Sequence, residues 1–90
     1  MSIEIPIYER SRKYGYVYWK KNMDNKIHSF LGNRRVVDVW LDNSYLGEKN
    51  VDRDHRRISL GYSRTRKLAQ TVKKFKLKFD KEGNLKIACI

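Results

Sequence analysis

Hydrophobic and polar positions alternate with a period of two over much of this chain, which is the pattern of half-buried β-strands. Near the N-terminus, Ile3, Ile5 and Ile7 alternate with polar residues and Pro6, which predicts a short edge strand. Near the C-terminus, Phe75, Leu77 and Phe79 alternate with lysines. The same reasoning predicts further strands over residues 12–21, 34–42, 57–62 and 85–89.

Two segments have helical spacing instead. Residues 25–31 carry Ile27, Phe30 and Leu31 on one helical face, with Asp24 as the expected N-cap and Gly32 after the last turn. The alternative for the same residues is a strand. A second helix is predicted after Ser63, because Leu68, Ala69, Val72 and Phe75 follow a helical period. The polar residues 43–54 are interpreted as a turn and a loop.

These elements give the order β-β-α-β-β-α-β-β over one domain, residues 1–90. The predicted class is α+β: a mostly antiparallel sheet of about five to six strands with one or two short helices. A small all-β barrel is the alternative.

Charge changes the picture, because it is very unevenly distributed. The formal net charge is +11, and residues 55–90 hold eleven basic groups against two acidic ones. No acidic residue lies between Asp54 and Asp80. Folding does not require such an excess, since like charges repel one another in the compact state. The pattern favours a polyanionic partner, and nucleic acid is the first candidate.

The lysine face of the predicted strand 74–79 is the main candidate for phosphate contact. Phe75 and Leu77 are expected to point into the core, so the alternate lysines stand in a row outside. We expect phosphates to be contacted by Lys74, Lys76 and Lys78 together with Arg64, Arg66 and Lys67 just upstream. The alternative is that the lysines protect an exposed strand from aggregation.

A second candidate lies in residues 12–19, where Tyr14, Tyr16 and Tyr18 occupy alternate positions of a predicted strand. The three tyrosines would share one face of this strand and would be flanked by cations such as Lys13. They would then offer a stacking platform for bases. The alternative is a half-buried ladder of cross-strand tyrosine pairs.

This string resembles the ribonucleoprotein-1 strand motif of RNA-recognition and cold-shock domains. The residues that fit the motif in order are Arg12, Tyr14, Gly15, Tyr16, Val17 and Trp19. Lys13 stands where the family has glycine, and the likeness is confined to residues 12–19. The resemblance implies that Tyr14 and Tyr16 stack on bases.

The cysteine, the apolar runs and the histidines of the chain argue against several classes of protein. The single cysteine, Cys89, has no partner for an internal disulfide, so we expect a reducing, cytoplasmic compartment. No apolar run is long enough to span a membrane. His28 and His55 lack the spacing of a metal site, no phosphate-cradling glycine loop occurs, and no cofactor is expected. The sequence therefore predicts a protein that is not an enzyme.

The leading hypothesis is a small basic domain that binds RNA or DNA without catalysis. The alternative is an adaptor or inhibitor that docks on an acidic protein surface, as small accessory proteins of phages and mobile elements do, with the charge serving rapid association. A small nuclease is the third hypothesis.

Overall fold

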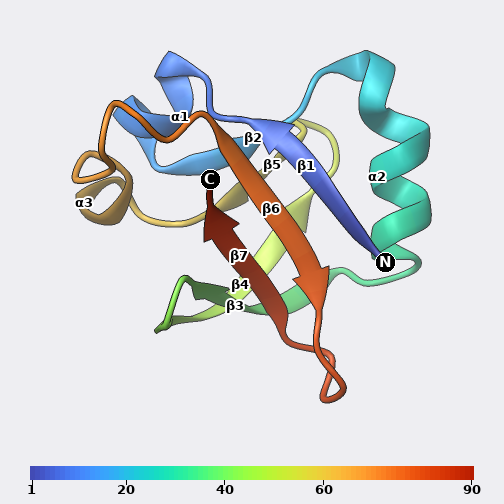
Figure 1. Ribbon diagram of the computed structural model, residues 1–90. Helices are drawn as coiled ribbons and strands as arrows, with labels where there is room; N and C mark the ends of the chain where they lie inside the picture. The colour runs from blue at the N-terminus through green and yellow to red at the C-terminus, as the bar shows by residue number, and fades with distance from the viewer.

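Seven strands form one sheet that curls into a nearly closed barrel in the computed structural model, which describes residues 1–90 (Figure 1). The strands are β1 (Ser2–Pro6), β2 (Tyr16–Tyr18), β3 (Val36–Leu41), β4 (Ser44–Asp52), β5 (Arg57–Ser59), β6 (Lys74–Phe79) and β7 (Leu85–Cys89). The helices are α1 (Glu9–Tyr14), α2 (Asp24–Leu31) and α3 (Tyr62–Thr65), with a 3₁₀ turn, η1 (Lys21–Met23), before α2. This confirms the α+β class, although the sheet has more strands than the sequence indicated.

The strand order is β1-β6-β7-β3-β4-β5-β2, and every neighbouring pair is antiparallel except β3 and β7. β1 pairs only with β6, so Pro6 does lie on an edge strand. Each strand places one set of alternate side chains inside the barrel, where they form a single core. None of the helices is long and apolar enough to cross a membrane.

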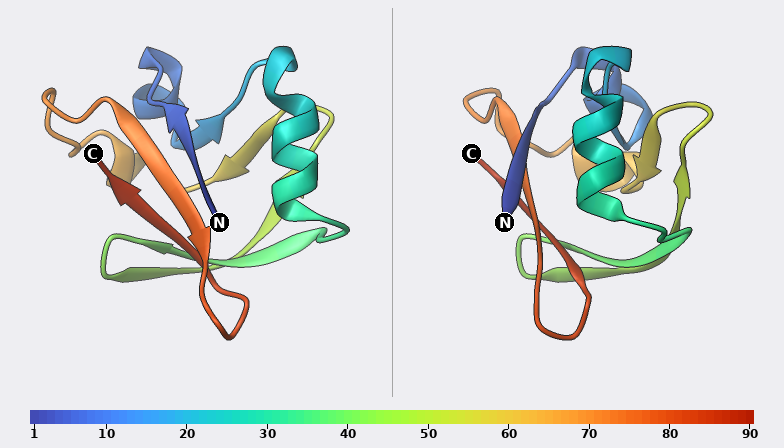
Figure 2. Two further views of the ribbon diagram at one scale, coloured as in Figure 1. Left: turned by 45° about the vertical axis from the view of Figure 1, so that its right-hand side comes forward. Right: turned by 90° about the vertical axis from the view of Figure 1, so that its right-hand side faces the viewer.

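Helix α2 covers one side of the barrel, as the right-hand view of Figure 2 shows. Its buried residues Ile27, Phe30 and Leu31 pack into the core, and the rings of Phe30 and Phe79 stack with their centroids 4.9 Å apart. The predicted helix is therefore confirmed, but Asp24 is not its cap. The Asp24 carboxylate instead accepts hydrogen bonds from Trp19 Nε1 at 2.9 Å and Arg56 Nε at 3.0 Å. The bond from Arg56 is the main cause that lowers the pKa of Asp24.

Residues 9–14 form helix α1, so the strand predicted over 12–21 is wrong for its first part. The Ser11 hydroxyl accepts a hydrogen bond from the Tyr8 backbone N–H at 3.1 Å, which supports the first helical turn. Gly15 ends the helix with φ at +81°, a conformation that favours glycine. Its carbonyl then accepts hydrogen bonds from the N–H groups of Leu60 and Gly61 at 2.6 and 3.0 Å.

The second predicted helix is also wrong, because α3 stops after four residues and the chain then turns. Arg12 supplies the hydrogen bonds that a continued helix would have supplied. Its guanidinium donates to the carbonyls of Leu68 at 2.9 Å and Val72 at 2.7 Å. The Thr65 hydroxyl in turn donates to the Arg12 carbonyl at 2.9 Å. Arg12 therefore holds the connection between α3 and β6.

Strand β4 occupies most of the segment that was interpreted as a loop. The pairing of β3 with β4 shifts between Val39 and Trp40, so Trp40 lies opposite Tyr45. Leu46, displaced by this bulge, packs against the core. The pattern of residues 34–42, with Val36 and Trp40 opposite Val37, Val39 and Leu41, suggests burial on both faces, but Trp40 is only half-buried and Val36 is exposed, so only one face of β3 lies in the core.

The contact at Gly15 predicts a severe effect of substitution. A Cβ at this position would lie 2.2 Å from the Tyr62 backbone nitrogen, so Gly15→Ala must displace the start of α3. We expect a loss of at least about 3 kcal/mol in the free energy of unfolding, measured by urea denaturation. Gly83→Ala is the matched control, because Gly83 has φ at +83° and nothing near its missing Cβ. Equal losses in the two variants would contradict the close contact.

The role of Arg12 predicts that Arg12→Met destabilises the protein by roughly 2 to 4 kcal/mol. The reason is that the partly buried carbonyls of Leu68 and Val72 lose their charged hydrogen-bond donor. Amide hydrogen exchange should accelerate in residues 66–73 before the barrel strands are affected. The exposed neighbour Lys13 provides the control, since Lys13→Met should change stability by less than about 0.5 kcal/mol. Unchanged exchange in 66–73 would show that Arg12 does not hold this segment.

Candidate functional site

The lysine face of β6 is formed as the alternation predicts. Phe75 and Leu77 are buried in the core, whereas Lys74, Lys76 and Lys78 are exposed on the outside of the barrel. β6 and β7 lie side by side at the front of the molecule in Figure 1, so these lysines project from an open sheet surface. β6 is not an edge strand, because β1 and β7 flank it. Protection of an edge therefore does not explain its lysines.

Counter-charges reach only one end of this row. Lys74 Nζ lies 3.3 Å from Glu4 Oε1, and both side chains are about half exposed. Lys76 and Lys78 have no carboxylate oxygen within 4 Å. An exposed pair such as Lys74 with Glu4 is worth little, so Lys74 can exchange its partner.

Strand β7 adds a cation that the sequence reasoning missed. Lys86 lies directly opposite Lys78 in the antiparallel pairing. Like charges in this position repel one another and weaken the sheet. The signal was present in the sequence, because Lys86 lies between the core residues Leu85 and Ile87 on the predicted closing strand.

Three of these lysines surround a hollow on the outer surface, which we call the lysine hollow. Its volume is about 470 Å³. It is lined by Asp42, Asn43, Lys76, Lys78, Lys86, Ile87, Ala88 and Ile90. Ala88 lies opposite Lys76, and its small side chain leaves room there. Among the side chains that line the hollow, one is acidic, that of Asp42, and three are lysines, so these side chains carry a net positive charge.

A second hollow adjoins the first at the turn between β3 and β4. Arg64 and Lys67 line it, together with Asp42, which the two hollows share. Arg66 lines neither hollow, and its guanidinium carbon lies 5.3 Å from the centre of the Tyr62 ring. The fold thus brings five cations, Arg64, Lys67, Lys76, Lys78 and Lys86, around one turn.

The three tyrosines do not share one strand face. Tyr14 lies at the end of α1, with Lys13 Nζ 5.4 Å from its ring centre. Tyr16 and Tyr18 lie on β2, where Tyr18 is only 6% exposed. The predicted stacking platform is therefore wrong, because residues 9–14 are helical and turn Tyr14 away from the strand.

Arginines already cover the two tyrosines of β2. The Arg10 guanidinium lies 4.2 Å from the Tyr18 ring centre, and that of Arg57 lies 4.5 Å from the Tyr16 ring centre. Tyr18 is in addition buried, and Arg57 is held over Tyr16 by its hydrogen bond to Asp52, so these two rings are not available to a base. Arg12 and Tyr14 lie on helix α1, and Arg12 is bonded to the carbonyls of Leu68 and Val72. Residues 12–19 therefore do not form a strand of the ribonucleoprotein-1 kind.

His55 belongs to a charged turn between β4 and β5. Its Nδ1 lies 3.0 Å from Asp52 Oδ2, and Arg57 Nε lies 3.2 Å from the same oxygen. Partial burial works to raise the pKa of Asp52, but the hydrogen bonds from His55 and Arg57 outweigh it and lower the pKa. No group of three or more histidine, cysteine, aspartate or glutamate side chains is placed to hold a metal ion.

Comparisons of this chain with known protein families, with curated proteins and with solved structures find no match.

Cys89 lies beside the lysine hollow on β7, and its backbone N–H donates to Asp42 Oδ1 at 3.3 Å. Partial burial, with a smaller contribution from the Asp42 charge, raises the pKa of the thiol to about 11. The thiol is therefore protonated and unreactive at neutral pH.

This pKa predicts slow alkylation of the native protein. Unfolded cysteine has a pKa of about 8.5, so at pH 9 the native thiol should react with iodoacetamide at least about 50-fold more slowly than the thiol in guanidinium chloride. The native rate should still rise between pH 9 and 11, as followed by mass spectrometry. Because removing the Asp42 charge lowers the pKa, Asp42→Asn should increase the native rate at pH 9. A native rate that levels off near pH 9 would contradict the raised pKa.

Proposed function

We propose that this protein is a nucleic-acid-binding domain that contacts phosphates through the outer surface of β6 and β7. The observation that carries this proposal is the lysine hollow, where Lys78 and Lys86 face each other directly and no carboxylate lies within 4 Å of Lys76 or Lys78. A sheet that keeps repelling cations together without neutralising them is suited to a polyanion.

The spacing of the cations supports the same partner. Alternate residues on one face of a strand lie about 7 Å apart, close to the separation of successive phosphates along one nucleic-acid strand. Lys76 and Lys78 have this relationship on β6, and Lys74 extends the row. Arg64 and Lys67 continue the positive surface past the turn at Asp42. Binding would release condensed counterions from the nucleic acid, and this release makes the affinity depend on salt.

The proposed activity is binding without catalysis, because ammonium groups neutralise phosphates but supply neither a nucleophile nor a general base at neutral pH. We place this activity in the cytoplasm, because the single cysteine, Cys89, is partly buried and has no partner for an internal disulfide.

Salt dependence tests the proposal. If the five cations around the turn neutralise about five phosphates, log K should fall with log salt with a slope of roughly −3.5 on single-stranded DNA. Lys76→Gln with Lys78→Gln should weaken binding and reduce the magnitude of the slope by roughly 1.4, as measured by fluorescence anisotropy.

The control removes the same charge elsewhere. Lys21 and Lys26 are exposed, lie on η1 and α2, and line neither hollow. Lys21→Gln with Lys26→Gln should leave the slope nearly unchanged. Equal losses in the two double variants, or no binding at low salt, would overturn the proposal. In the second case, a pull-down partner that survives nuclease treatment would favour docking on an acidic protein.

A further inference from the structure

An aromatic pair lies next to the lysine hollow on the outer surface of the barrel. The rings of Trp40 on β3 and Tyr45 on β4 have centroids 5.3 Å apart and are tilted by 45°. Tyr45 is 51% exposed, and Trp40 is half-buried. The bulge in β3 and β4 creates this pair, because it places Tyr45 opposite Trp40 while Leu46 packs against the core.

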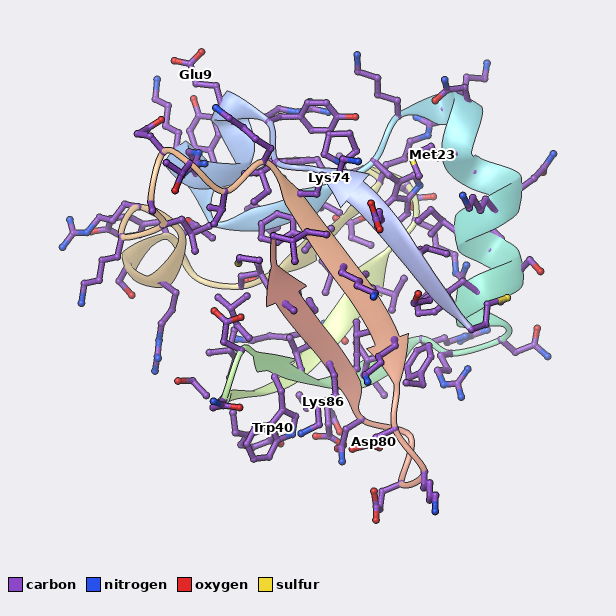
Figure 3. The ribbon with its side chains drawn as sticks, viewed as in Figure 1. Glu9, Met23, Trp40, Lys74, Asp80 and Lys86 are labelled. Atoms are coloured by element: carbon purple, nitrogen blue, oxygen red, sulfur yellow. The ribbon has the colours of Figure 1, made fainter.

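The pair continues the row of lysines across four strands. Lys78 on β6 lies opposite Lys86 on β7, Lys86 is paired with Trp40, and Trp40 is paired with Tyr45. Adjacent strands are about 4.8 Å apart, so cations and rings follow one another at short intervals. Lys86 Nζ lies 3.9 Å from the Trp40 ring centre, and Figure 3 shows the two side chains together at the lower end of the sheet.

Two carboxylates, those of Asp38 and Glu48, lie beside the aromatic pair on β3 and β4. The Tyr45 hydroxyl donates a hydrogen bond of 2.7 Å to Asp38, and Glu48 lies opposite Asp38 on β4. This bond to Asp38 raises the pKa of Tyr45, so its hydroxyl stays neutral, and the bond fixes the orientation of the ring. The two carboxylates repel phosphates. The phosphates of a bound strand must therefore stay over β6 and β7, while neutral, flat groups are accepted over the rings.

We propose that Trp40 and Tyr45 stack on unpaired bases, and that this surface therefore binds single-stranded nucleic acid in preference to duplex. The inference rests on the proposed function, because the phosphates of the same strand occupy the lysine hollow. A base has a free face for the rings only where it is unpaired and unstacked. Lys86 leaves the Trp40 ring for a phosphate when a base takes its place.

Tryptophan fluorescence of the unaltered protein gives the first test. The protein has two tryptophans, and Trp19 is only 1% exposed in the core, so a bound base can quench only Trp40. The probes are oligothymidylate of about 12 nucleotides and a DNA duplex with the same number of phosphates. We expect the oligothymidylate to quench part of the emission and the duplex to leave it unchanged. In Trp40→Phe the remaining emission, from Trp19, should not respond to either probe.

Affinity gives the second test. Trp40→Leu should weaken binding to oligothymidylate roughly 5- to 150-fold, the range expected for the loss of one stacked base, without changing the salt slope. Its affinity for duplex should remain within about twofold of the unaltered protein, which also shows that the variant is folded. Tyr14→Leu is the matched control, because Tyr14 is also an exposed aromatic residue but lines neither hollow, and its affinity for oligothymidylate should stay within about twofold of the unaltered protein.

The outcomes separate this inference from the proposed function. Binding of both probes with normal salt slopes, without quenching and without an effect of Trp40→Leu, would overturn the stacking inference and leave the phosphate surface in place. In that case the pair serves only to stabilise the hairpin of β3 and β4, and Trp40→Leu would lower the melting temperature alone. Failure of both probes to bind at low salt would overturn both proposals.

Discussion

The alternation of core and solvent positions in β6 is the constraint on which the rest of the structure depends. Phe75 and Leu77 are almost completely buried, and burying such side chains contributes about 1.5 to 3 kcal/mol each. Because successive side chains on a strand point to opposite faces, this burial forces Lys76 and Lys78 outward. The hydrophobic core thus places charge on one outer surface as a consequence of folding, and β7 repeats the effect by turning Lys86 to the same side.

The cations of this protein divide into two groups with different physical roles. Some are used inside the fold: Arg12 holds the turns after α3, Arg56 binds Asp24, and Arg10 covers the ring of Tyr18. Others, around the lysine hollow, have no carboxylate within 4 Å. Guanidinium groups, which are planar and weakly hydrated, fill most of the structural positions, whereas the open surface of β6 and β7 is made of lysine. The net charge alone did not distinguish these groups, since both contribute equally to it.

Only part of the candidate site could be predicted from the pattern of residues in the sequence. The exposed lysines of β6 followed directly from their alternation with phenylalanine and leucine. The tyrosines of residues 14–18 failed as a platform because Gly15, with its positive φ, ends a helix and precedes a strand. The aromatic pair that does lie beside the lysines was hidden, because Tyr45 belongs to a segment too polar to be recognised as a strand. Its position opposite Trp40 depends on a bulge.

The sequence by itself determined the α+β class, helix α2, strands β1, β6 and β7, and the outward direction of the β6 lysines, because these depend on periodicity within one segment. Only the tertiary structure decided that β3 runs parallel beside β7 and that Lys86 lies over the Trp40 ring. It also decided that the chain after Thr65 forms turns held by Arg12 and not a helix. These features join residues distant in the chain, and their free energy depends on which strands become neighbours. Local patterns of hydrophobic and charged residues therefore do not predict which strands become neighbours.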